Sequence, residues 1–249
     1  MKIIGVIPAR YGSTRFPGKP LVNLLGRPMI QWTIEGAKKS KLLSDVIVAT
    51  DDERIKVAAE AVGVKVVMTD SDLPTGSDRI HAAIKNENCD VVVNIQGDEP
   101  LVTGELIDKL AQVFIDEATL DMATLAHPIT EEELQSPNSV KVVLNCKSEA
   151  LYFSRFPMPY SRVSAKDMGT YDGCLKHIGM YAYTKSFLTR FCQAPPALIE
   201  KAESLEQLRA LYLGAKIKVV RVKEASLGVD TPEDLVRLEK ILKSGETHG

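Results

Sequence analysis

Three basic residues crowd the loop that follows the first apolar run of this sequence. Arg10, Arg15 and Lys19 lie among small residues directly after the run Ile3–Ile7. The first 34 residues carry five positive charges, and the first carboxylate that could offset them is Glu35. Guanidinium groups, ammonium groups and exposed backbone amides all bind phosphate oxygens, so the loop favours binding of a polyphosphate. A solvated loop without a ligand is the alternative that the residue pattern leaves open.

The same loop matches the Walker A phosphate-binding motif only in part. Five residues separate Gly12 from Gly18, where that motif has four, and Pro20 takes the place of its magnesium-binding Ser or Thr. We therefore expect a nucleoside triphosphate site of another type, at the carboxyl end of the first strand of a parallel sheet.

Two acidic segments supply candidate metal ligands. Asp98 follows the most hydrophobic run, Val91–Val93, and Asp230 precedes the helix that Pro232 begins. Carboxylates at strand ends can hold Mg²⁺ against a triphosphate, because this ion prefers oxygen ligands. Asp98 could instead lie in a turn, and Asp230 could cap the helix, although Thr231 can provide that cap alone. If both carboxylates converge on the basic loop, they form a site for metal-assisted phosphoryl or nucleotidyl transfer.

Three further segments carry side chains that could contact a ligand. The segment 75–79, Thr-Gly-Ser-Asp-Arg, could hold a base or ribose, or could simply begin a capped helix. His177 and Tyr181 share one face of a predicted strand, which could line a sugar pocket, although an isolated histidine is more often structural. Glu206 and Gln207 lie in the first turn of a predicted helix and could bind a polyol or be solvated.

Strands and helices alternate in the first half of the chain, which predicts a parallel sheet covered on both faces. The predicted strands, rich in Val and Ile on both faces, are Ile3–Ile7, Asp45–Ala49, Val64–Met68 and Asp90–Ile95, and the predicted helices are Pro28–Lys39, Asp52–Val62 and Ser77–Asn88. Ile55, Ala58, Ala59 and Val62 recur at helical spacing and indicate a buried helix face.

From Met122 the pattern changes to strand-like runs with few helices between them: Met122–Ala126, Val140–Asn145, Ala150–Ser154 and Leu175–Tyr183. The closing part predicts a helix over Ser204–Leu213 with Leu205, Leu208 and Tyr212 on its core face, then a strand over Lys216–Val222 and a helix over Pro232–Leu242. We expect an α/β fold: a mostly parallel, Rossmann-like nucleotidyltransferase sheet flanked by helices, in one domain over residues 1–249, with a smaller antiparallel insertion over about residues 122–190.

Composition excludes several classes of protein. The chain has 249 residues and a net charge of −2, which argues against a nucleic-acid-binding protein. It contains no apolar run of membrane-spanning length, and we expect its first residues to form a strand rather than a signal peptide. Its four cysteines show no CxxC spacing and predict reduced thiols, so we expect a cytoplasmic location.

Taken together, these motifs closely resemble the 3-deoxy-manno-octulosonate (Kdo) cytidylyltransferase family. The matching runs occur in the family's order and cover nearly the whole chain. They are residues 7–20 (IPARYGSTRFPGKP), 76–79 (GSDR), 94–100 (NIQGDEP), 137–143 (PNSVKVV), 151–155 (LYFSR), 177–183 (HIGMYAY), 205–209 (LEQLR) and 228–235 (GVDTPEDL).

The resemblance implies a magnesium-dependent transfer of CMP from CTP to the anomeric hydroxyl of an eight-carbon sugar acid, with release of pyrophosphate. It implies a triphosphate site of Arg10, Ser13, Arg15 and Lys19, and a nucleoside site of Pro8, Ala9, Thr75, Ser77 and Arg79. Asp98 and Asp230 would ligate Mg²⁺. The residues expected around the sugar acid are Gln96, Arg155, Arg162, His177, Tyr181, Glu206 and Gln207. The family is usually dimeric through the antiparallel segment.

Two motifs depart from the family pattern. Pro-Trp-Asp-Arg-Asp is replaced by Pro-Tyr-Ser-Arg-Val over residues 159–163, and Gly-Thr-Glu-Arg by Gly-Ser-Asp-Arg over residues 76–79. Neither change touches the residues expected at the metal or the triphosphate, so the implied reaction stands. The sugar acid could be Kdo or its 8-amino analogue.

Two other functions remain open at this point. One is a cytidylyltransferase for another acid sugar, such as a sialic acid. The other is a non-catalytic nucleotide-binding protein, which would leave the pairing of Asp98 with Asp230 without a purpose.

Overall fold

A computed structural model describes residues 1–12, 16–160, 162, 173–223, 228–229 and 231–244 of the chain. The chain divides into two compact units. Unit 1 comprises Met1–Ala111 and Ser226–Gly249, and unit 2 comprises Gln112–Ala225.

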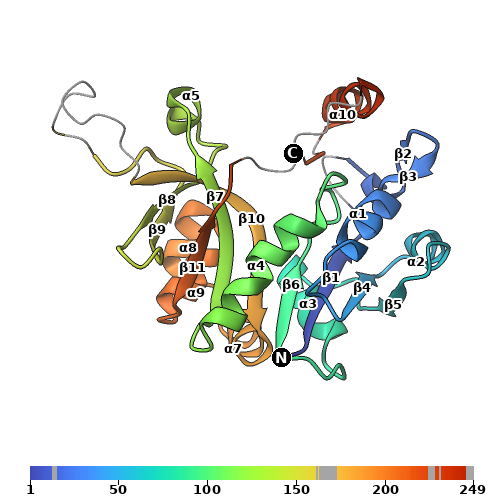
Figure 1. Ribbon diagram of the computed structural model, residues 1–249, viewed down its shortest axis with the longest axis horizontal. Helices are drawn as coiled ribbons and strands as arrows, with labels where there is room; N and C mark the ends of the chain where they lie inside the picture. Colours follow the sequence, from blue (N-terminus) through green and yellow to red (C-terminus); the bar gives the residue numbers. More distant parts are fainter. Residues whose placement is uncertain (13–15, 161, 163–172, 224–227, 230, 245–249) are drawn as a thin grey trace. The chain divides into compact units, whose positions relative to one another are not determined.

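Unit 1 is built on a parallel sheet with strand order β6-β1-β4-β5 (Figure 1). Its strands are β1 (Ile3–Ala9), β4 (Asp45–Thr50), β5 (Lys65–Met68) and β6 (Val91–Asn94). In register, Val6 of β1 is paired with Ile47 on one side and with Asn94 on the other. The four predicted strands are confirmed, with ends that differ by one or two residues from the expected ones.

The helices that lie between the strands of this parallel sheet confirm the predicted alternation. They are α1 (Met29–Lys38), α2 (Glu53–Glu60) and α3 (Gly76–Ala83). α1 and α2 contact each other, whereas α3 packs against β1 and β4. Because βαβ crossovers are right-handed, the chain places α1 and α2 on one face of the sheet and α3 on the other. Ile55 and Ala59 of α2 are buried, as their spacing predicts.

The edge strand β5 differs from the expectation that every strand is apolar and covered on both faces. Lys65 is exposed and Met68 keeps 42% of its surface exposed. β5 pairs with β4 on one side only. A lysine on such an edge discourages pairing with a strand from another molecule.

The C-terminal helix α10 (Pro232–Ser244) packs on the N-terminal part of unit 1 through an apolar cluster. Leu24, Met29, Val229 and Leu238 are its buried centre, with Phe16 and Trp32 among the side chains packed against them. Leu24 belongs to the short hairpin of β2 (Asn23–Leu24) and β3 (Arg27–Pro28). The indole Nε1 of Trp32 donates a hydrogen bond to the Leu24 carbonyl at 3.0 Å.

One long helix was not predicted. α4 (Gly104–Asp116) contains the boundary between the two units, and its buried positions Ile107, Leu110, Ala111 and Phe114 recur three and four residues apart. This spacing is the same signal that identified α2, so the helix could have been recognised from the sequence.

Unit 2 contains a mixed sheet. Its strands are β7 (Met122–Pro128), β8 (Lys141–Leu144), β9 (Ala150–Ser154), β10 (Cys174–Thr184) and β11 (Ile217–Arg221). β10 is antiparallel to both β7 and β8, β8 is antiparallel to β9, and β11 is parallel to β7. The strands predicted after Met122 are therefore present. The single-domain assignment and the insertion boundaries stay predictions.

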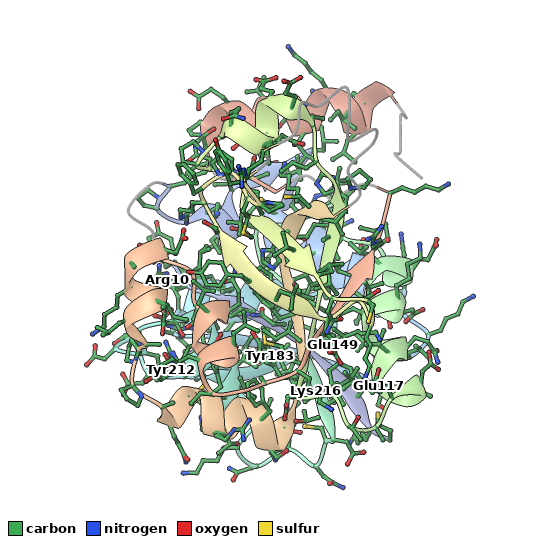
Figure 2. All side chains as sticks on the ribbon, turned by 90° about the vertical axis from the view of Figure 1, so that its left-hand side faces the viewer. Arg10, Glu117, Glu149, Tyr183, Tyr212 and Lys216 are labelled. Atoms are coloured by element: carbon green, nitrogen blue, oxygen red, sulfur yellow. The ribbon has the colours of Figure 1, made fainter. Side chains whose placement is uncertain are left out.

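Within the described residues of unit 2, the chain forms the helices α5 (Glu131–Gln135), α7 (Lys185–Gln193), α8 (Leu198–Glu203) and α9 (Gln207–Tyr212) after the end of α4. The predicted helix over Ser204–Leu213 begins too early, because Ser204 has a positive φ of 52° and ends α8. Tyr212 was wrongly assigned to the core face: 70% of its surface is exposed at the end of α9, whereas Leu205 and Leu208 are buried. Figure 2 shows Tyr212 at α9 and the buried Tyr183 among the strands.

A buried ion pair joins α8 to α9. The Arg209 guanidinium donates from Nε to Glu200 Oε2 at 2.9 Å and from Nη2 to Glu200 Oε1 at 2.5 Å. Only 7% and 11% of the two side chains is exposed. The ring of Phe191 lies 4.6 Å from the Arg209 guanidinium carbon. Such a pair is sensitive to loss of one partner, since the other charge is then buried alone.

The four cysteines are free thiols, as predicted, with Cys89 and Cys174 buried. Across the described residues, no helix combines the length and the apolar character that a membrane crossing requires.

We predict that Arg209→Leu lowers the free energy of unfolding by about 3 kcal/mol, because it strands the Glu200 carboxylate in the interior. Urea unfolding measures this change. Arg190→Leu is the matched control: Arg190 is 55% exposed and 3.9 Å from Asp121, so its loss should cost less than about 1 kcal/mol. Equal effects of the two substitutions would contradict the prediction.

We also predict a pH-dependent contribution from Glu133, which caps α5 and pairs with Lys176 Nζ at 2.7 Å. Burial raises the pKa of Glu133, but bonds from Lys176 and Thr130 outweigh it and lower the pKa from 4.5 to about 2. A lowered folded-state pKa stabilises the protein above pH 4.5, and this contribution is lost as the pH falls toward 2. In urea unfolding, Glu133→Gln should therefore be less stable than the parent protein at pH 7, by a margin that narrows at pH 4 and again at pH 3. A margin independent of pH would refute this assignment.

Candidate active site

A pocket of about 270 Å³ opens at the carboxyl ends of β1 and β6 in unit 1. The chain runs from β1 toward β4 and β5 and then returns to place β6 on the other side of β1. Such a reversal of strand order leaves a crevice at the strand ends, where ligands bind in open α/β sheets. The lining residues are Pro8, Ala9, Arg10, Lys19, Pro20, Leu73, Pro74, Thr75, Gly76, Arg79, Gln96, Gly97 and Asp98.

Eight of the predicted site residues line this one pocket: Pro8, Ala9, Arg10, Lys19, Thr75, Arg79, Gln96 and Asp98. Ser77 is buried in the first turn of α3. Ser13, Arg15 and Asp230 lie outside the described residues. The pocket also includes Pro20, Leu73 and Pro74, for which no ligand contact was predicted. Pro74 directly precedes the recognised segment 75–79 and could have been included with it.

Gly97 allows the two strand ends to approach each other closely. A Cβ atom at this position would lie 2.9 Å from the carbonyl oxygen of Pro8, closer than real Cβ contacts allow. The residue after Gly97 is Asp98, so this close approach places the carboxylate beside the end of β1. A larger residue at position 97 would push the two backbones apart.

The basic loop is closed by Gly18 and Tyr11. Gly18 adopts a φ of +70°, and its amide donates to the Tyr11 carbonyl at 2.9 Å. The Tyr11 ring packs beneath Gly18, and the Arg54 guanidinium carbon lies 3.6 Å from the ring centroid. Arg54 in turn pairs with Asp52, the N-cap of α2. These contacts fix the backbone just before Lys19.

Lys19 and Asp98 form an ion pair inside the pocket. The Lys19 Nζ donates to Asp98 Oδ2 at 2.6 Å, and 14% and 33% of the two side chains is exposed. The sequence predicted both residues in the site but did not predict that they contact each other. The pair places a cation and an oxygen donor at one point of the pocket wall.

The segment that carries Asp230 is joined to the segment that carries Asp98. The Val229 amide donates to the Asp98 carbonyl at 2.9 Å, and Asp230 is the next residue in the chain. Thr231 caps α10: its Oγ1 accepts from the Asp234 amide, and its own amide donates to the Asp234 carboxylate. The capping role proposed for Thr231 is therefore confirmed.

Segment 75–79 is a capped helix start that also borders the pocket. Thr75 is the N-cap of α3 and accepts from the Asp78 amide. Arg79 is only 3% exposed, and its guanidinium donates to Thr69 Oγ1 at 2.5 Å and to Asp51 Oδ2 at 3.0 Å. Arg79 is thus braced by partners from the ends of β4 and β5, which the sequence did not reveal.

The other predicted residues belong to unit 2. His177 lies on β10, and Thr124 Oγ1 is 3.0 Å from its Nε2. Thr124 Oγ1 also lies within hydrogen-bond distance of the Ile178 and Met180 carbonyls, where the pairing of β10 with β7 is irregular. Burial lowers the pKa of His177 to about 3, so the imidazole is neutral at neutral pH.

Tyr181 lies close to His177 and also to Glu206. The rings of His177 and Tyr181 are 5.4 Å apart, as expected for side chains on one strand face. Burial raises the pKa of Tyr181, and the nearby Glu206 carboxylate raises it further. Gln207 is 4% exposed, so it is not a solvated surface residue, and Arg162 is exposed.

The guanidinium group of Arg155 binds backbone carbonyls rather than a carboxylate group. Its Nε donates to the Glu203 carbonyl at 2.8 Å and its Nη1 to the Pro137 carbonyl at 3.0 Å. Its Nη2 contacts the Ser204 carbonyl at 3.4 Å. Its three guanidinium nitrogens therefore bind backbone oxygens from two other segments of unit 2.

Known proteins resemble this chain along almost its entire length. A family model described as cytidylyltransferase matches residues 4–217. The 3-deoxy-manno-octulosonate cytidylyltransferase of Bdellovibrio bacteriovorus is 82% identical over 98% of this chain and 99% of its own length. The enzyme of the same name from Chloroherpeton thalassium is 47% identical over 97% and 98% of the two chains.

A solved structure shows the same similarity in three dimensions. A CMP:2-keto-3-deoxy-manno-octonic acid synthetase complexed with CTP aligns with a TM-score of 0.93 and 41% identity, over 98% of this chain and 100% of that chain. A cytidylyltransferase from Leptospira borgpetersenii is 20% identical with a TM-score of 0.63, which supports the fold alone. By sequence and by structure, this chain belongs to the cytidylyltransferase family, among the 3-deoxy-manno-octulosonate cytidylyltransferases.

Proposed function

We propose that this protein transfers CMP from CTP to the anomeric hydroxyl of a 3-deoxy-octulosonate sugar acid, Kdo or its 8-amino analogue, with release of pyrophosphate. The product is an activated sugar for lipopolysaccharide synthesis. The observation that carries the proposal is the pocket at the ends of β1 and β6, where Arg10, Lys19 and Asp98 meet. The related synthetase that aligns along the whole chain was solved with CTP.

The reaction we propose is a single in-line displacement. The anomeric oxygen forms a bond to the α-phosphorus of CTP, the bond from that phosphorus to the β-phosphate oxygen breaks, and the hydroxyl proton is released. Negative charge grows on the departing pyrophosphate. Arg10 and Lys19 would supply positive charge at this place, which would stabilise the transition state more than the ground state.

The donor set fits Mg²⁺. Asp98 provides a carboxylate, and the Val229 amide that binds the Asp98 carbonyl immediately precedes Asp230. The described residues include no group of three or more His, Cys, Asp or Glu side chains suited to a metal. One or two carboxylates together with substrate phosphates are a common arrangement for this ion. Bound Mg²⁺ would offset phosphate charge and lower the pKa of the attacking hydroxyl.

In this proposal Lys19 serves two partners. In the protein alone it neutralises Asp98 at 2.6 Å. On binding of the triphosphate, the Lys19 ammonium group would turn to a phosphate oxygen, which would leave the Asp98 carboxylate available to hold a cation. The buried neutral His177 would orient the sugar by hydrogen bonding rather than by charge, since its pKa is about 3.

We further propose that the protein is a cytoplasmic homodimer. Exposed apolar side chains of Leu151, Phe156 and Tyr160 in the segment of residues 122–190 support an association surface there.

The function is tested by a pyrophosphate-release assay with CTP and Mg²⁺, with Kdo, 8-amino-Kdo and a sialic acid offered side by side. We expect turnover with one or both octulosonates and at least about 100-fold lower kcat/KM with the sialic acid. Mass spectrometry of the products identifies the CMP-sugar. Preference for the sialic acid would favour the other acceptor class, and CTP binding without any product would favour a nucleotide-binding protein.

We predict that Asp98→Asn lowers kcat/KM by about 100-fold or more, because it removes a charge that helps to bind the cation while keeping the size of the side chain. Calorimetry should also show that Mg²⁺ no longer strengthens CTP binding. Asp45→Asn is the matched control, since Asp45 is exposed at the amino end of β4. A fully active Asp98→Asn protein would refute the assigned role.

A further inference from the structure

Three separate segments of unit 2 meet at a cluster formed by Lys141, Arg155 and Glu203. Lys141 begins β8, Arg155 directly follows β9, and Glu203 is the last residue of α8. Most hydrogen bonds of this cluster go to backbone carbonyls rather than to other side chains. The cluster therefore fixes the course of the chain at three places.

Lys141 is the most unusual member, because its side chain has no exposed surface. Its Nζ donates to the Ser136 carbonyl at 2.6 Å and to the Arg155 carbonyl at 2.8 Å. A buried ammonium group is costly in free energy unless its donors are satisfied. Loss of either bond would therefore be unfavourable, and the two carbonyls are held in place. Since Lys141 is fully covered, any effect that it has on a substrate must pass through the carbonyls that it holds.

Arg155 extends the same connection. Its Nε and Nη2 atoms donate hydrogen bonds to the carbonyls of Glu203 and Ser204. This is one of the guanidinium edges that a carboxylate would use in a bidentate pair, and here it faces backbone oxygens. Arg155 is thus placed to shape the backbone at the end of α8.

The carboxylate of Glu203 adds two hydrogen bonds to the end of β9. Its Oε1 accepts from Ser154 Oγ at 2.7 Å, and its Oε2 accepts from the Arg155 amide at 2.9 Å. The carboxylate therefore ties the end of β9 to the end of α8. Glu203→Gln would keep the shape of this side chain but remove the charge that strengthens both bonds.

The segment that the cluster holds leads directly to Glu206 and Gln207, two residues that are predicted to contact the sugar acid. Ser204, with its positive φ, is followed after one residue by Glu206 and Gln207. The Leu205 amide donates to the Glu200 carbonyl, and the Arg209 amide donates to the Glu206 carbonyl. A shift of the Ser204 carbonyl would therefore be passed on to the Glu206 and Gln207 side chains.

We propose that Lys141, Arg155 and Glu203 are positioning residues for the sugar-acid acceptor, which act by holding the turn that carries Glu206 and Gln207. The inference rests on the proposed function and gives Arg155 an indirect role in place of direct contact with the sugar. Small displacements of positioning groups reduce productive binding, so these residues contribute to acceptor specificity.

The first experiment measures KM for Kdo, KM for CTP and kcat in full-length Glu203→Gln and Lys141→Met proteins with Mg²⁺. We expect KM for Kdo to rise about tenfold in each, with KM for CTP within about twofold of the parent value. Glu149→Gln and Lys218→Met are matched controls from unit 2. Glu149 binds the Asn145 side chain and Lys218 binds the Lys147 carbonyl, away from the cluster. Glu149 is labelled in Figure 2.

The second experiment is a double-mutant cycle of Arg155→Lys and Glu206→Gln, again read as KM for Kdo. If Arg155 acts through the turn, the two effects are coupled, and the double variant is little worse than the more damaged single variant. If Arg155 binds the acceptor by itself, the two fold-changes multiply, and the proposal is overturned.

Other results also overturn the proposal. They are an unchanged KM for Kdo in both Glu203→Gln and Lys141→Met, or an equal rise in KM for CTP and for Kdo. Should Lys141→Met fail to fold, as judged by circular dichroism, Glu203→Gln and the cycle decide the question. Failure of the proposed function is distinguishable, because the parent protein would then give no CMP-sugar with an octulosonate.

Discussion

The hydrogen bond from the Val229 amide to the Asp98 carbonyl is the constraint on which the proposed chemistry depends. It joins a segment near the C-terminus to the loop after β6, and each of these segments carries one of the two predicted metal ligands. A backbone bond suits this role because it is directional and leaves the side chains available. The apolar cluster that contains Val229 and Leu238 also holds this segment in place. Distant parts of the sequence are thus kept together without using a functional side chain.

Charge balance explains why acidic and basic groups share one wall of the pocket. The proposed triphosphate site needs cations, whereas the proposed magnesium site needs carboxylates, and the two sets would be costly if each were left alone in a half-buried pocket. The contact of Lys19 with Asp98 satisfies both groups before any ligand binds. Gly97 makes the contact possible by letting the loop after β6 approach Pro8. Sheet topology, backbone shape and electrostatics therefore agree at a single place.

Local sequence patterns predicted those features of the structure that depend on residues close together in the chain. The strands of the parallel sheet, the buried face of α2, the Thr231 cap and the row formed by His177 and Tyr181 follow from spacing and capping preferences. Contacts between remote segments were not predictable in this way. The carbonyls that engage Lys141 and Arg155, and the partners that brace Arg79, come from other elements whose register no local pattern gives. The assignment of Tyr212 to the core was wrong for a related reason: spacing alone did not show that α9 ends at this residue, whose side chain is exposed. The family resemblance supplied roles for residues but not the bonds between them.

Trp32 gives the molecule a built-in optical reporter. It is the only tryptophan in the chain, and it packs on the cluster that contains Val229 together with Phe16. Phe16, in the basic loop, packs against the same cluster, and Val229, in the second acidic segment, belongs to it, so the cluster connects Trp32 with both segments. Its Nε1 is held by the Leu24 carbonyl and the Arg27 guanidinium lies 5.1 Å from its ring, which makes its emission sensitive to small changes in packing and local charge. Intrinsic fluorescence would therefore be able to follow binding of a nucleotide at the proposed site in unit 1 without an added label.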